Sequence, residues 1–204
     1  MITTSITEFA TLELIPPHTL DNPDPILAKL LARLADQQST WSSHDLQFFA
    51  NTGSEPCEVY LITGWKDVAA HERWITSDQN QELLVKSGRF LKVKGMVHLS
   101  LDYNTVPTDI QTIVCEKYGP WSEVRGLAAS TEEKEKEAEL QKGSQKEVEW
   151  MGAGKDLDPN AQGDFYKFTS CTNRWRDKIV ASATKHKEVI VMKRVDVKAL
   201  LKKT

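Results

Sequence analysis

The order in which strand-like and helix-like segments follow one another constrains the fold of this chain more than any other feature. Residues 5–15 alternate in the manner of a β-strand, and residues 25–39 carry leucines at helical spacing. The segments that follow are two strands, a helical region and a further strand, at 44–51, 57–65, 66–88 and 93–103. This strand–helix–strand–strand–helix–strand order is that of a ferredoxin-like unit.

Local signals mark where the helices begin and end. Asp24 and Pro25 supply an N-cap and a first-turn proline for the first helix. Ser77 is placed to cap the last helical piece of this unit, which Gly88 ends.

The same order of segments returns after a short linker at 104–107. Strands are expected at 109–118, 146–154, 164–171 and 187–197, and helices at 130–146 and 173–186. Because a ferredoxin-like sheet has helices on one face only, its bare face must be buried. We therefore expect an α+β fold of two tandem ferredoxin-like βαββαβ repeats, 1–104 and 105–204, packed sheet-to-sheet as a single-chain, pseudo-dimeric α/β barrel. A single ferredoxin-like domain with an irregular tail is the alternative.

Composition excludes several classes of protein. The chain has 204 residues and a net charge of −3, so duplex nucleic acid is not an expected partner. No apolar run reaches the roughly 20 residues of a membrane span, and the start has no basic signal region, which predicts a cytoplasmic protein. The cysteines at 57, 115 and 171 lack CxxC spacing, and no GxGxxG, GxxxxGK[ST], HExxH or GxSxG motif occurs. We expect no metal site.

One stretch of the first unit resembles a known family. The sequence LITGWKDVAAHERWITSDQNQELL, residues 61–84, is similar to the strand-to-helix segment of the antibiotic biosynthesis monooxygenase (ABM) family of the dimeric α/β-barrel superfamily. The matching features are Trp65 at the strand end, Ala70 and Trp74 in the helix, and Ser77 with Asp78 at the helix break. The superfamily includes cofactor-independent oxygenases, heme-degrading enzymes, peroxidases, polyketide cyclases and aldoxime dehydratases. Its usual subunit is small and forms dimers, so a homodimer of this longer chain is left open.

The resemblance places a pocket between the first sheet and its helices, with Trp65 pointing into it. An indole there could hold an aromatic substrate by stacking, although a plain core tryptophan is the alternative. At 100° per residue, His71 lies at the centre of the helix face turned to the sheet, with Trp74 and Asp78 on the same arc. We expect His71 to be the catalytic acid or base and Trp65, Trp74 and Asp78 to bind substrate. A satisfied core histidine, a core Trp74 and a capping role for Asp78 remain open.

Tyr60 and His98 form a second candidate pair. If Trp65 faces the helices, period two turns Tyr60 to the opposite, inter-sheet face. Assigning the apolar residues of the strand 93–103 to the helix face leaves His98 beside Tyr60. By the same parity Glu8 faces the helices, where it is either solvated at a strand end, the interpretation we favour, or paired in the pocket.

The heme-degrading branch of the superfamily has a ligand histidine and a first-strand asparagine where Leu84 and Ala10 stand in this chain. We therefore expect no heme and no other cofactor. The predicted function is a small-molecule enzyme of specialised metabolism that oxygenates an aromatic or polyketide-like compound without a cofactor. The alternatives are a cyclase, dehydratase or isomerase that uses His71 in the same pocket, and a non-catalytic ligand-binding protein.

Overall fold

The structure is a computed structural model that describes residues 5–51, 56–119, 148–159, 163–181 and 187–203. The strands are β1 (Ile6–Leu14), β2 (Gln47–Ala50), β3 (Glu58–Trp65), β4 (Leu91–Leu99), β5 (Thr112–Tyr118), β6 (Val148–Lys155), β7 (Phe165–Cys171) and β8 (Lys187–Arg194). The helices are α1 (Pro25–Ser42), α2 (Val68–Ile75), α3 (Asp78–Ser87), the 3₁₀ turn η1 (Tyr103–Thr105), α6 (Asn173–Ala181) and α7 (Val197–Leu200).

All eight strands form one curled antiparallel sheet in the order β4-β1-β3-β2-β8-β5-β7-β6. The two halves meet edge to edge, where Phe49 and Ala50 of β2 pair with Arg194 and Lys193 of β8. The sheet curls until its outer strands meet at one end, which we call the seam. There Leu99 bridges to Asp156, next to the strand ends of β4 and β6. The expected α+β, barrel-like fold is confirmed at this level, whereas the division at residue 104 stays a prediction.

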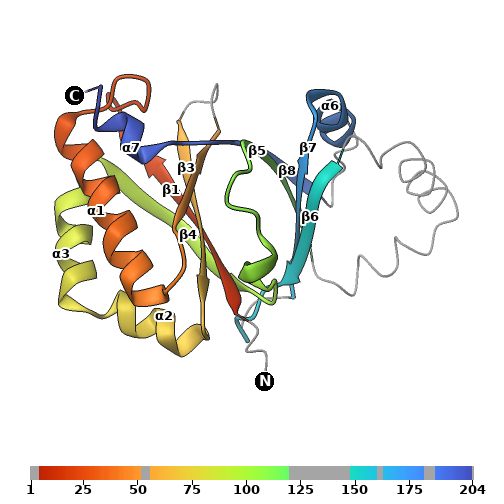
Figure 1. Cartoon of the computed structure of the whole chain (residues 1–204), viewed down its shortest axis with the longest axis horizontal. Coiled ribbons are helices and arrows are strands. Elements are labelled where there is room, and N and C mark those ends of the chain that lie inside the picture. The colour runs from red at the N-terminus through yellow and green to blue at the C-terminus, as the bar shows by residue number, and fades with distance from the viewer. Residues whose placement is uncertain (1–4, 52–55, 120–147, 160–162, 182–186, 204) are drawn as a thin grey trace, which may run out of the picture.

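The helices α1, α2 and α3 cover the outer face of β4-β1-β3-β2, as Figure 1 shows on its left side. Residues of β3 alternate across the sheet as the sequence predicts. Val59, Leu61 and Trp65 join the core under the helices, while Tyr60 and Ile62 face the interior of the curl.

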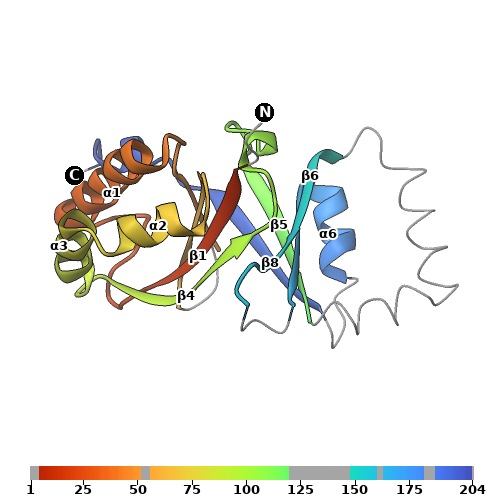
Figure 2. The ribbon, with the colours of Figure 1, turned by 90° about the horizontal axis from the view of Figure 1, so that it is seen from below.

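The interior of the curl is filled by side chains from both halves. Phe9 of β1 stacks on Tyr60, and its ring lies 5.3 Å from that of Phe168 and 6.1 Å from that of Tyr166, both on β7. Helix α6 covers the outer face of the second half, where Ile179 packs against strand residues (Figure 2). The two halves therefore share one core inside a single curled sheet, whereas two separate sheets were expected.

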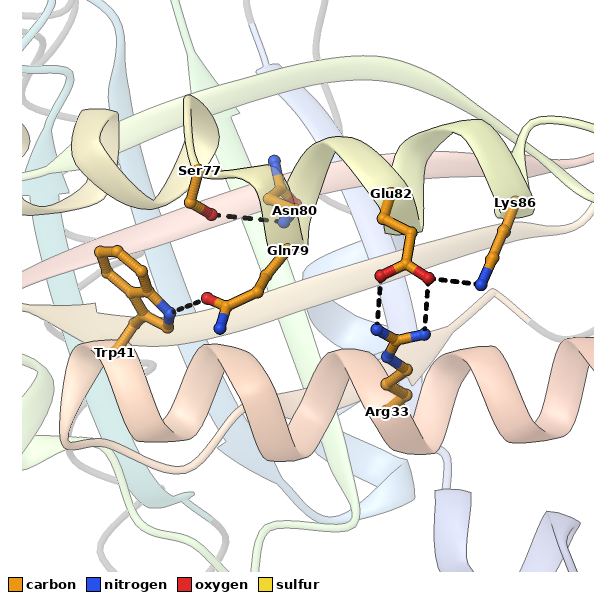
Figure 3. A network of polar contacts seen from close by, with 7 residues as sticks. All are labelled: Arg33, Trp41, Ser77, Gln79, Asn80, Glu82 and Lys86. Atoms are coloured by element: carbon orange, nitrogen blue, oxygen red, sulfur yellow. Dashed lines mark hydrogen bonds and ion pairs between the residues drawn. The ribbon is translucent and has the colours of Figure 1, made fainter.

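Helices α1 and α3 are joined by the polar contacts drawn in Figure 3. Arg33 donates to both carboxylate oxygens of Glu82, at 3.2 and 2.6 Å, and Lys86 pairs with the same carboxylate. Nearer the start of α3, the Trp41 indole donates to Gln79 at 2.8 Å. The contacts of Arg33 with Glu82 and of Trp41 with Gln79 join α1 to α3, whereas the Glu82–Lys86 pair lies within α3.

Most of the expected helix and strand segments are present, with shifted ends. The Asp24 and Ser77 caps form as predicted, and α1 continues to Ser42. The last strand ends at Arg194, and the short helix α7 then returns to α1 and adds apolar side chains to the core beneath it. The expected helix at 130–146 lies outside the described residues. Among the described helices, none is long and apolar enough to cross a membrane.

The prediction that His98 lies on the Tyr60 face is wrong. Leu12 of β1 pairs with Val93 and Thr11 with Gly95, so β4 carries a β-bulge with one extra residue at Lys94. A one-residue insertion reverses which face each later side chain takes. Leu99 therefore points into the interior of the curl, and His98 points to the helices.

Candidate functional site

Three ionisable side chains meet beneath the helices of the first half. Oε2 of Glu8 lies 3.3 Å from Nε2 of His71, and Nδ1 of His71 lies 2.7 Å from Nε2 of His98. We call Glu8, His71 and His98 the Glu–His–His group. It forms one continuous line of polar contacts.

Three different elements bring the Glu–His–His group together. Glu8 on β1 and His98 on β4 are direct partners in the strand register, so both side chains project from the same patch of the sheet. His71 contacts both residues of this pair from α2, in the sheet-facing position that its helical spacing predicts. Asp67 caps the start of α2 by accepting a hydrogen bond from the backbone N–H of Ala70 at 2.7 Å.

Two neutral side chains anchor the carboxyl group of Glu8. The indole N–H of Trp65 and the side-chain amide of Gln38 each donate to Oε2, both at 2.7 Å. The Trp65 ring also stacks on the His71 ring, with centroids 4.5 Å apart and planes 24° apart. Trp65 therefore orients two members of the group at once.

Burial governs the protonation of these groups. Only 3% of Glu8 and 2% of His71 are exposed. Desolvation raises the pKa of Glu8 from 4.5 to about 7, against the smaller opposing effect of the Trp65 and Gln38 hydrogen bonds. Burial, with His98 nearby, lowers the pKa of His71 from 6.5 to about 3. Burial also lowers the pKa of His98. At neutral pH both rings are therefore neutral and Glu8 is close to its titration midpoint.

The predicted site residues separate into groups in the structure. Trp65, His71 and His98 lie together, although His98 was expected on the opposite face of the sheet from Trp65 and His71. Trp74 is buried in the core under the helices, with its ring 5.7 Å from that of Trp41. Asp78 is exposed in the first turn of α3.

Tyr60 lies on the other face of the sheet, as expected. Its ring stacks on Phe9, and its hydroxyl donates to Glu58 at 2.5 Å. Tyr60 is therefore separated by the sheet from the histidine that was paired with it in the sequence interpretation.

Sequence reasoning undervalued Glu8 and missed Gln38. The interpretation of Glu8 as a solvated strand-end residue is wrong, and the paired alternative is what the structure has. The signal was a carboxylate at a helix-facing position of a strand, where burial without a partner is costly. The signal for Gln38 was its place four residues after Leu34, on the apolar stripe of α1.

Within the residues that the structure describes, no group of three histidine, cysteine, aspartate or glutamate side chains is arranged to hold a metal ion. The Glu–His–His group has a geometry suited to proton transfer: a carboxyl group, two imidazoles, short contacts between them and little access to water.

Comparison with known proteins shows the fold and leaves the family unassigned. No protein-family model matches this sequence, and no curated protein does. A "putative monooxygenase" from Fusobacterium nucleatum subsp. nucleatum is similar in structure, with 10% identity, a TM-score of 0.55, and 96% of this chain and 94% of that one covered. A second "putative monooxygenase", from Lactobacillus acidophilus, has 13% identity and a TM-score of 0.53, with 94% of each chain covered.

A mutant chlorite dismutase from Candidatus Nitrospira defluvii, in complex with cyanide, has 10% identity and a TM-score of 0.62. The alignment covers 100% of this chain and 95% of that one. These likenesses cover 94–100% of this chain and show a fold of the dimeric α/β-barrel type. Membership of the ABM family stays a prediction.

Proposed function

We propose that this chain is a small-molecule enzyme of the oxygenase type, and that its acid–base chemistry takes place at the Glu–His–His group. The observation that carries the proposal is the buried contact of Glu8 with His71 and of His71 with His98. The names of two structural neighbours support the oxygenase class. The pKa of Glu8, raised to about 7, supports a proton acceptor matched to neutral pH.

The proposed substrate is an aromatic or polyketide-like compound of specialised metabolism with a weakly acidic O–H or C–H group. Its proton passes to the Glu–His–His group, and the electron-rich anion that remains reacts with oxygen without a cofactor. Trp65 stacks on His71 in this structure, so its first role is to position that ring. Direct contact of Trp65, Trp74 or Asp78 with substrate stays a prediction.

The test is oxygen consumption by the purified chain with hydroxylated tricyclic aromatic compounds. His71→Ala is expected to lower turnover by about 10²–10⁴-fold, the usual cost of losing a general acid or base. His44→Gln is the control, because His44 is a partly buried histidine whose ring packs on Tyr103, a residue of the core inside the curl. Unchanged oxygen uptake in His71→Ala would contradict the proposal. Turnover without oxygen uptake would favour a cyclase, dehydratase or isomerase.

A non-catalytic, ligand-binding protein is the second candidate, and one observation favours it. The residues Trp65 and Trp74 are 0% and 2% exposed, so protein atoms already cover the surfaces on which a substrate ring would stack. The Glu–His–His group would then be a satisfied core network. If the protein is non-catalytic, any turnover that screening detects has another source. Neither His71→Ala nor His98→Gln should then change its rate.

A heme-dependent activity is the alternative raised by the chlorite dismutase neighbours, and the described residues of the first half do not fit it. Both ring nitrogens of His71 are engaged, by Glu8 and by His98. At the two positions compared with the heme-degrading branch, Ala10 is buried in the apolar core and Leu84 is 41% exposed.

We also propose that residues 1–104 and 105–204 are tandem ferredoxin-like repeats, a single-chain counterpart of a two-subunit barrel. The support is the strand order, since β8-β5-β7-β6 has the same fourth–first–third–second arrangement as β4-β1-β3-β2. In this arrangement the first repeat alone supplies the Glu–His–His group.

A further inference from the structure

We propose that Glu8, His71 and His98 form a proton relay, and that Nδ1 of His98, at the seam, is the atom that takes a proton from a neutral, weakly acidic ligand such as a phenol or an enol. The relay rests on the proposed function, because it names the group in that site which meets the substrate. It also changes the role of His71 from the substrate's base to the middle member of the relay.

His71 is enclosed by its partners. Nε2 faces Glu8 and Nδ1 faces His98, and the ring surface is stacked on Trp65. A ligand could reach either nitrogen only by breaking one of these contacts. His98 is different, since the residue is only partly buried and its ring is engaged through Nε2. Within the described ranges, its Nδ1 has no hydrogen-bond partner.

A segment of the second half of the chain lies beside His98. The backbone N–H of Leu157 donates to the carbonyl of His98 at 2.7 Å, which holds the segment 156–158 against β4. Asp156 and Asp158 in this segment, with Glu72 on α2, oppose the effect of burial by raising the pKa of His98. The negative charges of these three carboxylates favour the protonation of His98 and repel a ligand that is already an anion. A neutral acid is therefore the ligand that fits.

The hydrogen-bond pattern sets the starting tautomers. Oε2 of Glu8 accepts from Trp65 and Gln38, so it is an acceptor toward His71 as well. Nε2 of His71 must then carry a hydrogen, which leaves its Nδ1 as an acceptor. Nε2 of His98 supplies the hydrogen of the contact between the rings. This leaves Nδ1 of His98 without a hydrogen, ready to accept one.

The net transfer is one proton from the ligand to Glu8, and it takes place as three proton transfers, one at each of three hydrogen bonds. The ligand's proton bonds to Nδ1 of His98 while the proton on Nε2 of His98 passes to Nδ1 of His71. The proton on Nε2 of His71 then passes to Oε2 of Glu8. The ligand becomes an anion, the carboxylate becomes a neutral carboxylic acid, and both imidazoles stay neutral with exchanged tautomers. The net charge of the protein and ligand together is unchanged.

The groups that face the relay come from each element packed around it: Glu8 on β1, Gln38 on α1, Trp65 on β3, Glu72 on α2, and Asp156 and Asp158 after β6. No described lysine or arginine contacts Glu8 or the two histidines. Within the relay, Glu8 is the group whose pKa, about 7, lies nearest to neutral pH. A proton that enters at His98 is therefore expected to end on Glu8.

Nitrogen NMR of histidines in the full-length protein tests the relay without any turnover. As pH falls through about 7, both His71 and His98 are expected to change from the Nε2–H to the Nδ1–H tautomer in one shared step, with no imidazolium formed. Glu8→Gln should abolish that step. His44→Gln should leave it intact. Independent titration of His71 and His98 as imidazoliums, or a tautomer step that persists in Glu8→Gln, would overturn the relay.

Phenol and benzoate are the ligand probes. Phenol should shift the Nδ1 signal of His98 and benzoate should not, while the signals of His44 respond to neither. A response to benzoate alone, or to neither probe, would overturn the assignment of His98 as the ligand-facing end. Because none of these measurements needs turnover, a working relay in a protein that consumes no oxygen would show that the proposed function alone had failed.

Discussion

At the scale of single residues, Glu8 is a buried carboxyl group whose burial costs free energy and whose raised pKa suits proton chemistry. A carboxyl group that is 3% exposed keeps its charge only if its partners replace the lost water. Trp65 and Gln38 provide two hydrogen bonds, and the raised pKa shows that they replace it incompletely. A buried group whose protonation changes near neutral pH is suited to catalysis and is a poor choice for stability alone.

Glu8→Gln should therefore change how stability depends on pH. Between pH 4.5 and about 7 the folded protein holds a proton on Glu8 that the unfolded chain has released, so this residue's contribution to stability falls as pH rises. Because glutamine does not titrate, Glu8→Gln does not lose this stability as pH rises. Its free energy of unfolding, relative to wild type, should rise by up to about 3 kcal/mol from pH 4.5 to pH 8.

Urea unfolding at several pH values measures this difference. His71 acts with the opposite sign: its lowered pKa means that its contribution is lost as pH falls from 6.5 toward 3, in wild type and Glu8→Gln alike. The exposed Glu188 on β8 supplies the control, Glu188→Gln. If the free energy of unfolding of Glu8→Gln differs from that of wild type by the same amount at every pH in this range, the pKa of Glu8 is not raised toward 7 in the folded protein.

At the scale of elements, α2 is a short helix that carries the central member of the Glu–His–His group. Its start depends on Asp67, whose carboxylate accepts from the N–H of Ala70. The same kind of cap begins α1, where Asp24 accepts from the N–H of Ile26 at 2.7 Å. The two caps have equal chemistry, but only the cap of α2 lies one turn from His71.

Asp67→Ala and Asp24→Ala form a matched pair on this basis. Each should lower the free energy of unfolding by about 0.5–2 kcal/mol, the usual cost of losing such a cap. Thermal denaturation measures that loss. Only Asp67→Ala should shift or broaden the NMR signals of His71 and His98, since only it loosens α2. Equal spectra for the two variants would mean that the sheet and Trp65, rather than the helix start, hold His71 in place.

At the scale of the whole molecule, the contact between β4 and the segment after β6 at the seam places Leu157 beside His98. Gly154 on β6 lies against Leu101, and an added Cβ would come within 2.7 Å of the Leu101 backbone nitrogen. Backbone atoms cannot give way as a flexible side chain can. Gly95 on β4 has no atom within 4 Å of the same added position.

Gly154→Ala should therefore separate the strands at the seam, while Gly95→Ala should not. The expected loss of stability for Gly154→Ala is about 1–3 kcal/mol, as for other overpacked sites. Faster hydrogen exchange at the N–H of Leu157 is the local measure, because that group donates to His98 across the seam. Wild-type exchange at Leu157 in Gly154→Ala would show that the seam does not depend on this contact.

The fragment 1–104 tests the joint core. In the whole chain Phe9 packs against Tyr166 and Phe168, and Val197 and Leu200 of α7 complete the core under α1. Without them the fragment exposes apolar surface on two sides, so it should aggregate or self-associate. Analytical ultracentrifugation measures this. A monomeric, cooperatively folding fragment would count strongly against a shared core.

Much of the fold follows from the sequence because local signals agree with one another. The leucines of α1, the caps Asp24 and Ser77, and the alternation of β3 each depend on near neighbours in the chain, and each is found as predicted. The face of His71 could be predicted for the same reason, since helical spacing alone turns it to the sheet.

The candidate site itself was decided by tertiary structure. The bulge at Lys94 reverses the face of His98, and apolar residues on both sides of β4 hide that reversal from any periodicity argument. Whether Glu8 is solvated or paired depends on Gln38 and Trp65, which are 30 and 57 residues away in sequence. The sequence alone thus determined that Glu8 and His71 face each other across the sheet–helix interface, and which element holds each one. Only the register of β4 on β1 and the packing of α1 and α2 above them bring Glu8, His71 and His98 within hydrogen-bonding distance, because contacts between distant segments depend on the whole fold.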